Sequence, residues 1–303
     1  YTSLGFLTFG FPVTKWWGAS IGLLPFSSVG YNVSYEETPV NIGRTKYTYE
    51  GTGGLSQFYL GNAFRLWKNF SAGFNASFLF GSLDKIATVS FPDSSAYMYA
   101  LRLKNSAFVN DFSFSYGLQY VKPLNNDITL VLGMVYNAET NLLARQDSLA
   151  YRFLSSGDGI EIVKDTLVNS DNTRGNIVLP KGFGGGFTLG KKDRWLVGMD
   201  YQMQQWQDFS AFGVKDSLKN SWGVSFGAEY TPQNTAVSGY WKRVHYRFGS
   251  RYNLTYLSLK DNQLTEKSIS FGLGLPLKRT KTAMNIGVEI GQRGTLSDWL
   301  IKE

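Results

Sequence analysis

The chain has 303 residues, a formal net charge of +7 and many aromatic residues: 22 Phe, 18 Tyr and 8 Trp. It has no Cys and one His, so disulfides, thiolate metal sites and His-rich metal centres are excluded, and no cofactor is expected. No stretch approaches the ~20 consecutive apolar residues that a membrane-spanning helix needs.

Alternation between apolar and polar residues is the main pattern along the chain, as expected where successive side chains of a strand point to opposite faces. In the first clear example, Phe70, Phe74 and Phe78 share one face while Ser71 and Asn75 share the other. The same pattern recurs in the segments 111–120, 221–230 and 284–291. Many of these segments are longer than the ~5–6 residues typical of soluble strands, which argues against a soluble sandwich.

The connections between these segments alternate between short and long. Short connections are predicted near Thr14–Trp17, Leu66–Asn69, Lys122–Asp127, Gly190–Arg194, Thr231–Gly239 and Pro276–Thr282. Longer ones are predicted near Glu37–Lys46, Phe91–Met98, Ser148–Asp171, Asp208–Leu218 and Leu259–Glu266. Short periplasmic turns and long extracellular loops are typical of outer-membrane barrels. The sequence therefore predicts an all-β, antiparallel, up-and-down transmembrane barrel as one domain over residues 1–303, with about twelve strands in this chain.

Aromatic residues gather beside the short connections. They are Trp16, Trp17, Trp67, Tyr120, Trp195, Tyr230 and Trp241. Such a girdle is typical of the membrane–water interface, where an amphipathic ring suits the headgroup level. Basic residues gather at the same turns without forming an aromatic-interleaved groove, so a nucleic-acid partner is not expected.

Charged residues fall on the polar face of the later strands, which should point into the lumen because charge facing lipid is costly. They are Asp200, Glu229, His245, Arg247, Arg251, Glu289 and Arg293. A salt-bridge network that holds the lumen together or seats a plug is the plain interpretation. A ligand-headgroup or gating site is the sharper one. Catalysis is not expected, because no nucleophile stands at a recognisable spacing from the Glu and His.

Pro25 interrupts an otherwise regular strand, Trp17–Tyr35. Proline has no N–H for the ladder, so inside a sheet it marks an edge, a bulge or an interruption. Leu24, Pro25, Phe26 and Ser27 are therefore candidates either for a local bulge or for a lateral gap through which an apolar molecule leaves the lumen.

Strand parity bears on the ends of the chain. The first short connection implies a strand that runs toward the periplasm, and the last strand runs outward. Barrels usually have an even number of strands. We therefore expect one more strand at each end, about fourteen in all, with an N-terminal hatch and first strand outside this sequence.

The chain resembles the FadL-type outer-membrane transporters of long-chain fatty acids and hydrocarbons. The resemblance lies in Ile21–Tyr31, Arg247–Asn253, Ile269–Leu277 and Ile286–Gly294. It implies fourteen strands around a hatch, and a kink in the third strand, the one that carries Pro25. The family's Asn-Pro-Ala-type hatch segment is not in this sequence, and the connection at Phe91–Met98 is short where the family has a helical capture loop.

Two functions follow as hypotheses for a protein of the Gram-negative outer membrane. The first is passive uptake of hydrophobic molecules, with lateral exit near the kinked strand. The second is a non-transporting accessory subunit of a larger outer-membrane complex for barrel assembly, secretion or nutrient uptake. The partners expected are membrane lipid, lipopolysaccharide, a hydrophobic ligand and other outer-membrane proteins.

Overall fold

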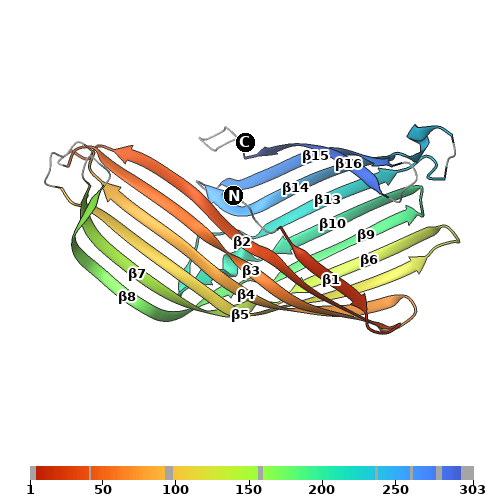
Figure 1. Cartoon of the computed structure of the whole chain (residues 1–303), viewed down its shortest axis with the longest axis horizontal. Helices are drawn as coiled ribbons and strands as arrows, with labels where there is room; N and C mark the ends of the chain where they lie inside the picture. The colour runs from red at the N-terminus through yellow and green to blue at the C-terminus, as the bar shows by residue number, and fades with distance from the viewer. Residues whose placement is uncertain are drawn as a thin grey trace.

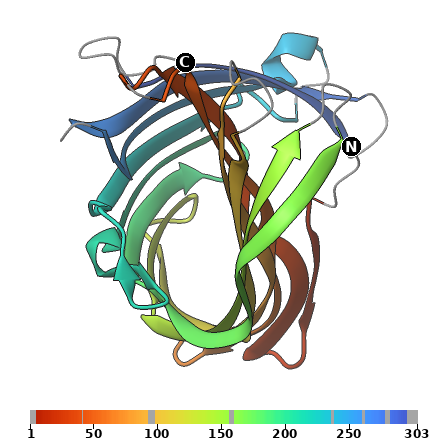
Figure 2. The ribbon, with the colours of Figure 1, turned by 90° about the vertical axis from the view of Figure 1, so that its left-hand side faces the viewer.

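The computed structural model describes residues 5–40, 42–92, 98–155, 160–235, 238–259, 262–277 and 282–294. One antiparallel sheet contains twelve strands in a continuous path, and it curls around as a barrel wall (Figures 1 and 2). In order these are β1 (Leu7–Pro12), β2 (Trp17–Glu37), β3 (Thr45–Arg65), β4 (Phe70–Ser90), β5 (Ala100–Pro123), β6 (Ile128–Asn137), β9 (Gly182–Lys191), β10 (Trp195–Gln204), β13 (Ser221–Tyr230), β14 (His245–Leu259), β15 (Asn262–Pro276) and β16 (Ala283–Arg293). Among these residues, β16 and β1 are not hydrogen-bonded to each other.

The remaining elements lie beside this path. β7 (Thr140–Ser155) pairs with the outer half of β5, and β8 (Glu161–Leu179) pairs with β7. The short strands β11 (Ser210–Ala211) and β12 (Val214–Lys215) follow the 3-10 helix η1 (Trp206–Asp208). A second 3-10 helix, η2 (Tyr240–Arg243), precedes β14. In the described part of the chain, no helix is long and apolar enough to span a membrane.

The twelve predicted strands are confirmed. The prediction of a long connection at Ser148–Asp171 is wrong, because this segment is largely β-strand. Most of that segment belongs to the β7–β8 hairpin. The ladder between these strands has three register shifts, after Gln146, Ala150 and Arg152. The net extra residues lie in β8, since β7 pairs with β5 without a shift. Each one reverses the alternation between faces, so the period-two pattern that identifies a strand is lost in β8.

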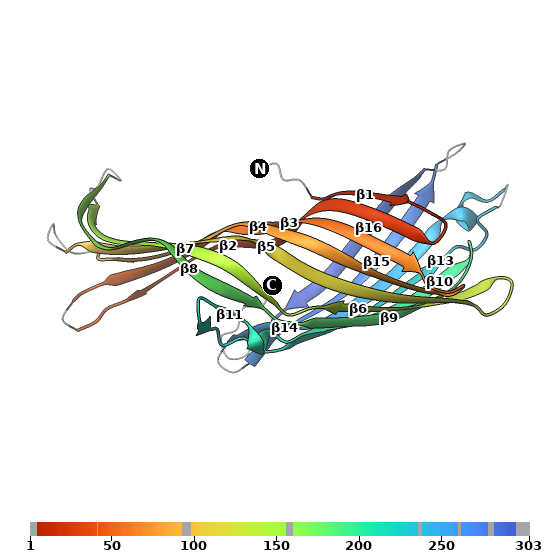
Figure 3. The same ribbon diagram turned by 90° about the horizontal axis from the view of Figure 1, so that it is seen from below.

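The strands have two very different lengths. β6, β9, β10 and β13 have 10 residues each, enough for a tilted membrane strand of ~9–11 residues. β2 to β5 have 21 to 24 residues and continue well beyond that height (Figures 1 and 3). We call the outer halves of β2–β5, together with β7 and β8, the projecting sheet.

The two faces of the sheet exchange character at one row of paired residues, Leu55, Gly81 and Val109. On the periplasmic side of this row, the outward face carries exposed apolar residues. They include Phe58, Leu60, Phe74, Phe80, Phe112 and Phe114. Beyond the row, the same face carries Thr52, Asp84 and Lys104. We call it the boundary row, because an apolar outward face suits lipid and a charged one suits water.

A small hydrophobic core lies on the lumen side of the boundary row. Its buried residues are Leu55, Leu79, Val109, Leu142, Ala144 and Ile177, with Phe209, Ala211 and Phe212 packed against them. Leu79 and Leu142 are fully buried. The core ties the β7–β8 hairpin and the η1–β11 segment to the wall at the height where the membrane part ends.

β5 changes partner at the same height. It pairs with β7 as far as Val109, opposite Ala144, and with β6 from Ser115 onward. Between these points, the Asp111 carboxylate accepts hydrogen bonds from the backbone N–H of Leu143 at 2.8 Å and of Phe112 at 2.7 Å. The side chain thus replaces a ladder acceptor where the strand pairing is interrupted.

Close backbone packing at the boundary row depends on glycine. Gly81 has φ +147°, and a Cβ there would lie 2.3 Å from the carbonyl oxygen of Gly54. Gly53 has φ +105°, and its Cβ would lie 2.3 Å from the carbonyl oxygen of Ser82. Both contacts are to backbone, which cannot move without breaking the ladder.

We predict that Gly81→Ala lowers the free energy of unfolding by about 1–3 kcal/mol through backbone strain and overlap. Gly117→Ala on β5 is the matched control, because its Cβ would lie 3.8 Å from the nearest atom. Urea unfolding in detergent micelles, followed by tryptophan fluorescence, measures both. Equal stability of the two variants would contradict the proposed tight packing.

Candidate functional site

Pro25 lies in β2 at a one-residue β-bulge. Pro25 pairs with Ser56 and Ser27 pairs with Leu55, so Phe26 is the extra residue. The ladder to β3 continues on both sides of the bulge, from Trp17 to Glu37. On the other edge of β2, the described pairing with β1 ends at Leu23, opposite Leu7. Among the described residues, Leu24, Pro25 and Ser27 therefore have a paired neighbour only on the β3 side, and Phe26 has none.

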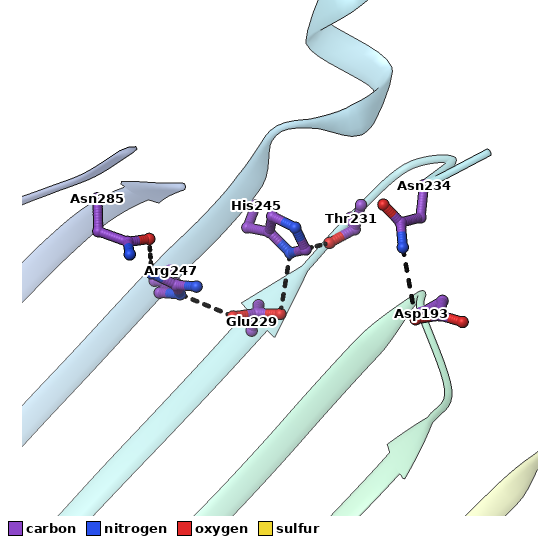
Figure 4. Close-up of polar contacts among 7 residues, drawn as sticks. All are labelled: Asp193, Glu229, Thr231, Asn234, His245, Arg247 and Asn285. Atoms are coloured by element: carbon purple, nitrogen blue, oxygen red, sulfur yellow. Dashed lines mark hydrogen bonds and ion pairs between the residues drawn. The ribbon is translucent and has the colours of Figure 1, made fainter. Parts of the chain in front are cut away.

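The charged residues of the later strands form close contacts on the lumen face (Figure 4). Glu229 on β13 accepts a hydrogen bond from Arg247 Nε at 2.7 Å, and its other oxygen lies 3.2 Å from His245 Nδ1. Arg247 Nη1 donates to Asn285 Oδ1 on β16 at 2.8 Å. This cluster links β13, β14 and β16 across the intervening β15.

Other members of the predicted charged set pair separately. Arg251 Nη2 lies 3.9 Å from Glu289 Oε1. Arg293 Nε lies 3.1 Å from Glu266 Oε1. Asp200 on β10 has no ion-pair partner among the residues that the structure describes, and it lines a lumen cavity of about 1040 Å³ with Trp206 and Tyr256. Among themselves the seven residues therefore form a cluster of three and one ion pair rather than one network, and Arg293 pairs with Glu266 outside the set.

Three members of these contacts were missed by sequence reasoning: Thr231, Glu266 and Asn285. Glu266 was placed in a predicted connection, and only the register of β15 with β16 brings it opposite Arg293. Asn285 is uncharged and did not stand out. A search for polar residues on the lumen face of every strand could have found Asn285, but the cross-strand register could not be read from one sequence.

The geometry around His245 is that of a structural contact. Thr231 Oγ1 lies 2.9 Å from Nδ1, the same ring nitrogen that faces Glu229. A triad requires the hydroxyl and the carboxylate on different ring nitrogens, so that a proton can pass between them. In the described part of the chain, no group of three or more His, Cys, Asp or Glu residues could hold a metal ion.

The aromatic residues predicted as a girdle lie at the end of the barrel with the short connections. Trp16, Trp17 and Phe64 stack on one another with ring centroids 6.1 to 6.5 Å apart. Trp67 is 69% and Trp241 65% exposed. Trp195 pairs with Tyr230, and Tyr120 pairs with Phe70. Contact of these rings with lipid headgroups stays a prediction.

We predict that Glu229→Ala lowers the free energy of unfolding by about 1–2 kcal/mol, because Arg247 and His245 lose a close, partly buried acceptor. Glu289→Ala is the matched control on the same lumen face. Its ion pair within the described residues is long and half-exposed, so a change below about 0.5 kcal/mol is expected. Urea titration of both variants in the same detergent tests the difference, and equal losses would contradict a special role for the Glu229 cluster.

Three solved structures share this fold at low sequence identity. The toluene transporter TodX of P. putida matches with a TM-score of 0.57 and 16% identity, covering 95% of this chain and 75% of that chain. A FadL homologue of Pseudomonas aeruginosa matches with a TM-score of 0.57 and 12% identity, covering 95% and 69%. The CymD monoaromatic hydrocarbon channel matches with a TM-score of 0.53 and 14% identity, covering 95% and 77%.

These likenesses confirm the FadL-like barrel fold. No curated protein matches the chain. The family model that matches is a different one from the FadL-type transporters: BamG, over residues 1–303. With its lipid-facing apolar band, the chain is an outer-membrane β-barrel, and it belongs to the BamG family.

Proposed function

We propose that this barrel is a non-transporting accessory subunit of a larger outer-membrane complex, the barrel-assembly machine. Membership of the BamG family supports this proposal. The structural observation that carries it is the projecting sheet, which extends the wall well beyond the shorter strands on one side of the barrel (Figure 3).

The lumen-side face of the projecting sheet is apolar and rich in tyrosine. Register places Tyr31, Val33 and Tyr35 of β2 on the same face as Tyr47 and Tyr49 of β3. The Tyr35 ring lies 5.0 Å from that of Tyr47 and 6.3 Å from that of Tyr49, measured between centroids. Leu101 and Leu103 of β5 share the face. We call this surface the tyrosine face.

The opposite face of the same strands has a very different composition. It carries the ion pairs Glu36–Arg44, Lys104–Asp84 and Arg102–Glu161. The tyrosine face carries Glu37 and Lys85. At its β7–β8 end, Arg152 donates to Asp165 at 2.8 Å. These hydrogen bonds from Arg152 lower the pKa of Asp165, so that the pair stays charged in mildly acidic solution.

An exposed apolar surface beyond the membrane favours contact with a protein. Val33 is 56% exposed and Tyr35 45% exposed. Tyrosine is enriched and Lys and Glu are depleted at the centres of protein interfaces, because a large ring buries much area with one polar tip. The three ion pairs on the other face leave the centre of the tyrosine face, around Tyr35, Tyr47 and Tyr49, mainly apolar, which matches that pattern.

We predict that Tyr35→Ser with Tyr49→Ser reduces recovery of partner proteins at least tenfold when the tagged barrel is purified from its own membranes in mild detergent. Partners are quantified by mass spectrometry. Ser34→Ala with Thr48→Ala, on the opposite face of the same strands, is the matched control and should leave recovery unchanged. The difference in gel mobility between heated and unheated samples shows whether each variant forms a folded barrel.

Two results would contradict this proposal. One is a wild-type protein that purifies alone as a monomer. The other is full partner recovery by the folded tyrosine variant, which would show that the tyrosine face is not part of the interface.

We keep passive uptake of hydrophobic molecules as a second candidate, with lateral exit near Leu24–Ser27. It is supported by the likeness of the fold to hydrocarbon channels and by the bulge at Phe26, just past the last described β1–β2 pair. Transfer of apolar surface from water into lipid, at ~25 cal/mol per Å², would supply the driving force.

For uptake, we predict that cells expressing the wild-type barrel accumulate radiolabelled oleate or toluene faster than cells with an empty vector. Pro25→Val, which adds a backbone N–H on the edge of β2 that faces β1, should reduce the excess rate at least threefold. Pro12→Val, at the end of β1, is the control and should not. Equal rates in wild-type and empty-vector cells would remove transport from consideration.

A further inference from the structure

Two arginines face each other on the outward side of the projecting sheet. Arg145 of β7 and Arg174 of β8 are direct cross-strand partners. Like charges directly opposite each other in a sheet are destabilising. Among the described residues, neither guanidinium has a carboxylate within 4.0 Å, whereas Arg102 and Arg152, which lie farther along the same sheet, each pair with an acid.

The arginines lie at the height where the lipid-facing band ends. Arg145 pairs with Phe108 of β5, and its guanidinium lies 4.9 Å from the centroid of that ring. Tyr120, in the periplasmic girdle, and Phe108 are twelve residues apart on β5, which is roughly 40 Å along the strand. A tilt of about 45° makes this roughly 28 Å across the membrane, close to the hydrocarbon thickness of ~30 Å.

The surroundings of the pair suit a phosphate on a lipid. The same surface cavity is lined by the amides Asn110, Asn141 and Asn176 and by Leu143. Leu143 is 64% exposed and Phe112, one step toward the membrane, is 54% exposed. Guanidinium groups bind phosphate through two parallel N–H bonds, and amides add further donors. Exposed apolar side chains beside them suit acyl chains.

The nearest acid along β7 does not neutralise the site. Asp147 lies two residues farther along the strand, and its Oδ1 accepts the backbone N–H of Asn172 at 2.7 Å. It makes no ion pair with Arg145 or Arg174 in the described part of the chain. The two positive charges are therefore left for an external anion.

We propose that Arg145 and Arg174 form a binding site for a phosphate group of the phosphorylated glycolipid in the outer leaflet, lipopolysaccharide. The site explains why two like charges are kept opposite each other at this height. It is independent of the tyrosine face, which lies on the other side of the sheet, and of either proposed function.

The test is binding of fluorescent lipopolysaccharide to the purified full chain in detergent. Arg145→Gln with Arg174→Gln should weaken binding at least tenfold. Lys46→Gln with Lys164→Gln, which removes the same charge elsewhere on the projecting sheet, should change it less than twofold. Lipopolysaccharide with dephosphorylated lipid A should bind the wild type as weakly as intact lipopolysaccharide binds the arginine variant.

Urea unfolding in the same detergent is a second measurement, which does not rely on a binding curve. Without lipid, the arginine variant should unfold at the same or a higher urea concentration than the wild type, because a repulsion is removed. With lipopolysaccharide, only the wild type and the lysine control should be stabilised. Unchanged binding by the arginine variant overturns the proposal. Saturation by millimolar inorganic phosphate, without lipid preference, would assign the site to free phosphate and overturn the lipid source.

Discussion

Backbone hydrogen bonding is the constraint on which the rest of this structure depends. In lipid, each backbone N–H and C=O needs a partner within the protein, which closely paired strands supply. The β3–β4 ladder continues in register from the membrane part into the projecting sheet, and the β2–β3 ladder continues with one register shift, at Phe26. The solvent on the two sides of the sheet changes at the boundary row. The two faces therefore exchange polarity while the backbone pairing continues, and glycines at 53 and 81 let the ladders stay close there.

This continuity explains how two surfaces of opposite character come from one sheet. In the membrane part, the outward face is apolar because it meets lipid, and the lumen face carries Glu229, Arg247 and Arg251. Beyond the boundary row, the outward face is charged and the lumen-side face carries tyrosine. The small core around Leu79 and Leu142 lies at the changeover, where it holds the β7–β8 hairpin against the wall.

Much of the wall could be predicted from the sequence, because alternation between lipid and lumen is strict in a membrane strand. The strand segments around Phe74, Phe114 and Phe226 followed directly from it. The β7–β8 hairpin could not, since the bulges of β8 reverse its alternation and both faces of the hairpin are mixed. The bulge at Pro25 was one of two open interpretations, and a proline without its N–H cannot by itself distinguish a bulge from a gap. For Glu229 and Arg247, the sequence predicted only that both side chains lie on the lumen face, not that they are in contact. The contacts with Asn285 and Thr231, and the pairing of Glu266 with Arg293, depend on the register, which one sequence does not determine.

The change of partner along β5 has a mechanical consequence. A load applied to the outer end of β2, β3 or β4 acts along strands whose hydrogen bonds run across the load, so that many bonds share it at once. At Asp111 the ladder is interrupted, and one carboxylate joins β5 to the backbone of Leu143. Force carried by the β7–β8 hairpin therefore reaches the membrane barrel through the ladder with β5, through the hydrophobic core and through the two-residue links to β6 and β9. The part of the projecting sheet made of β2, β3 and β4 is therefore stiff, whereas the β7–β8 hairpin can pivot where it is attached to β5.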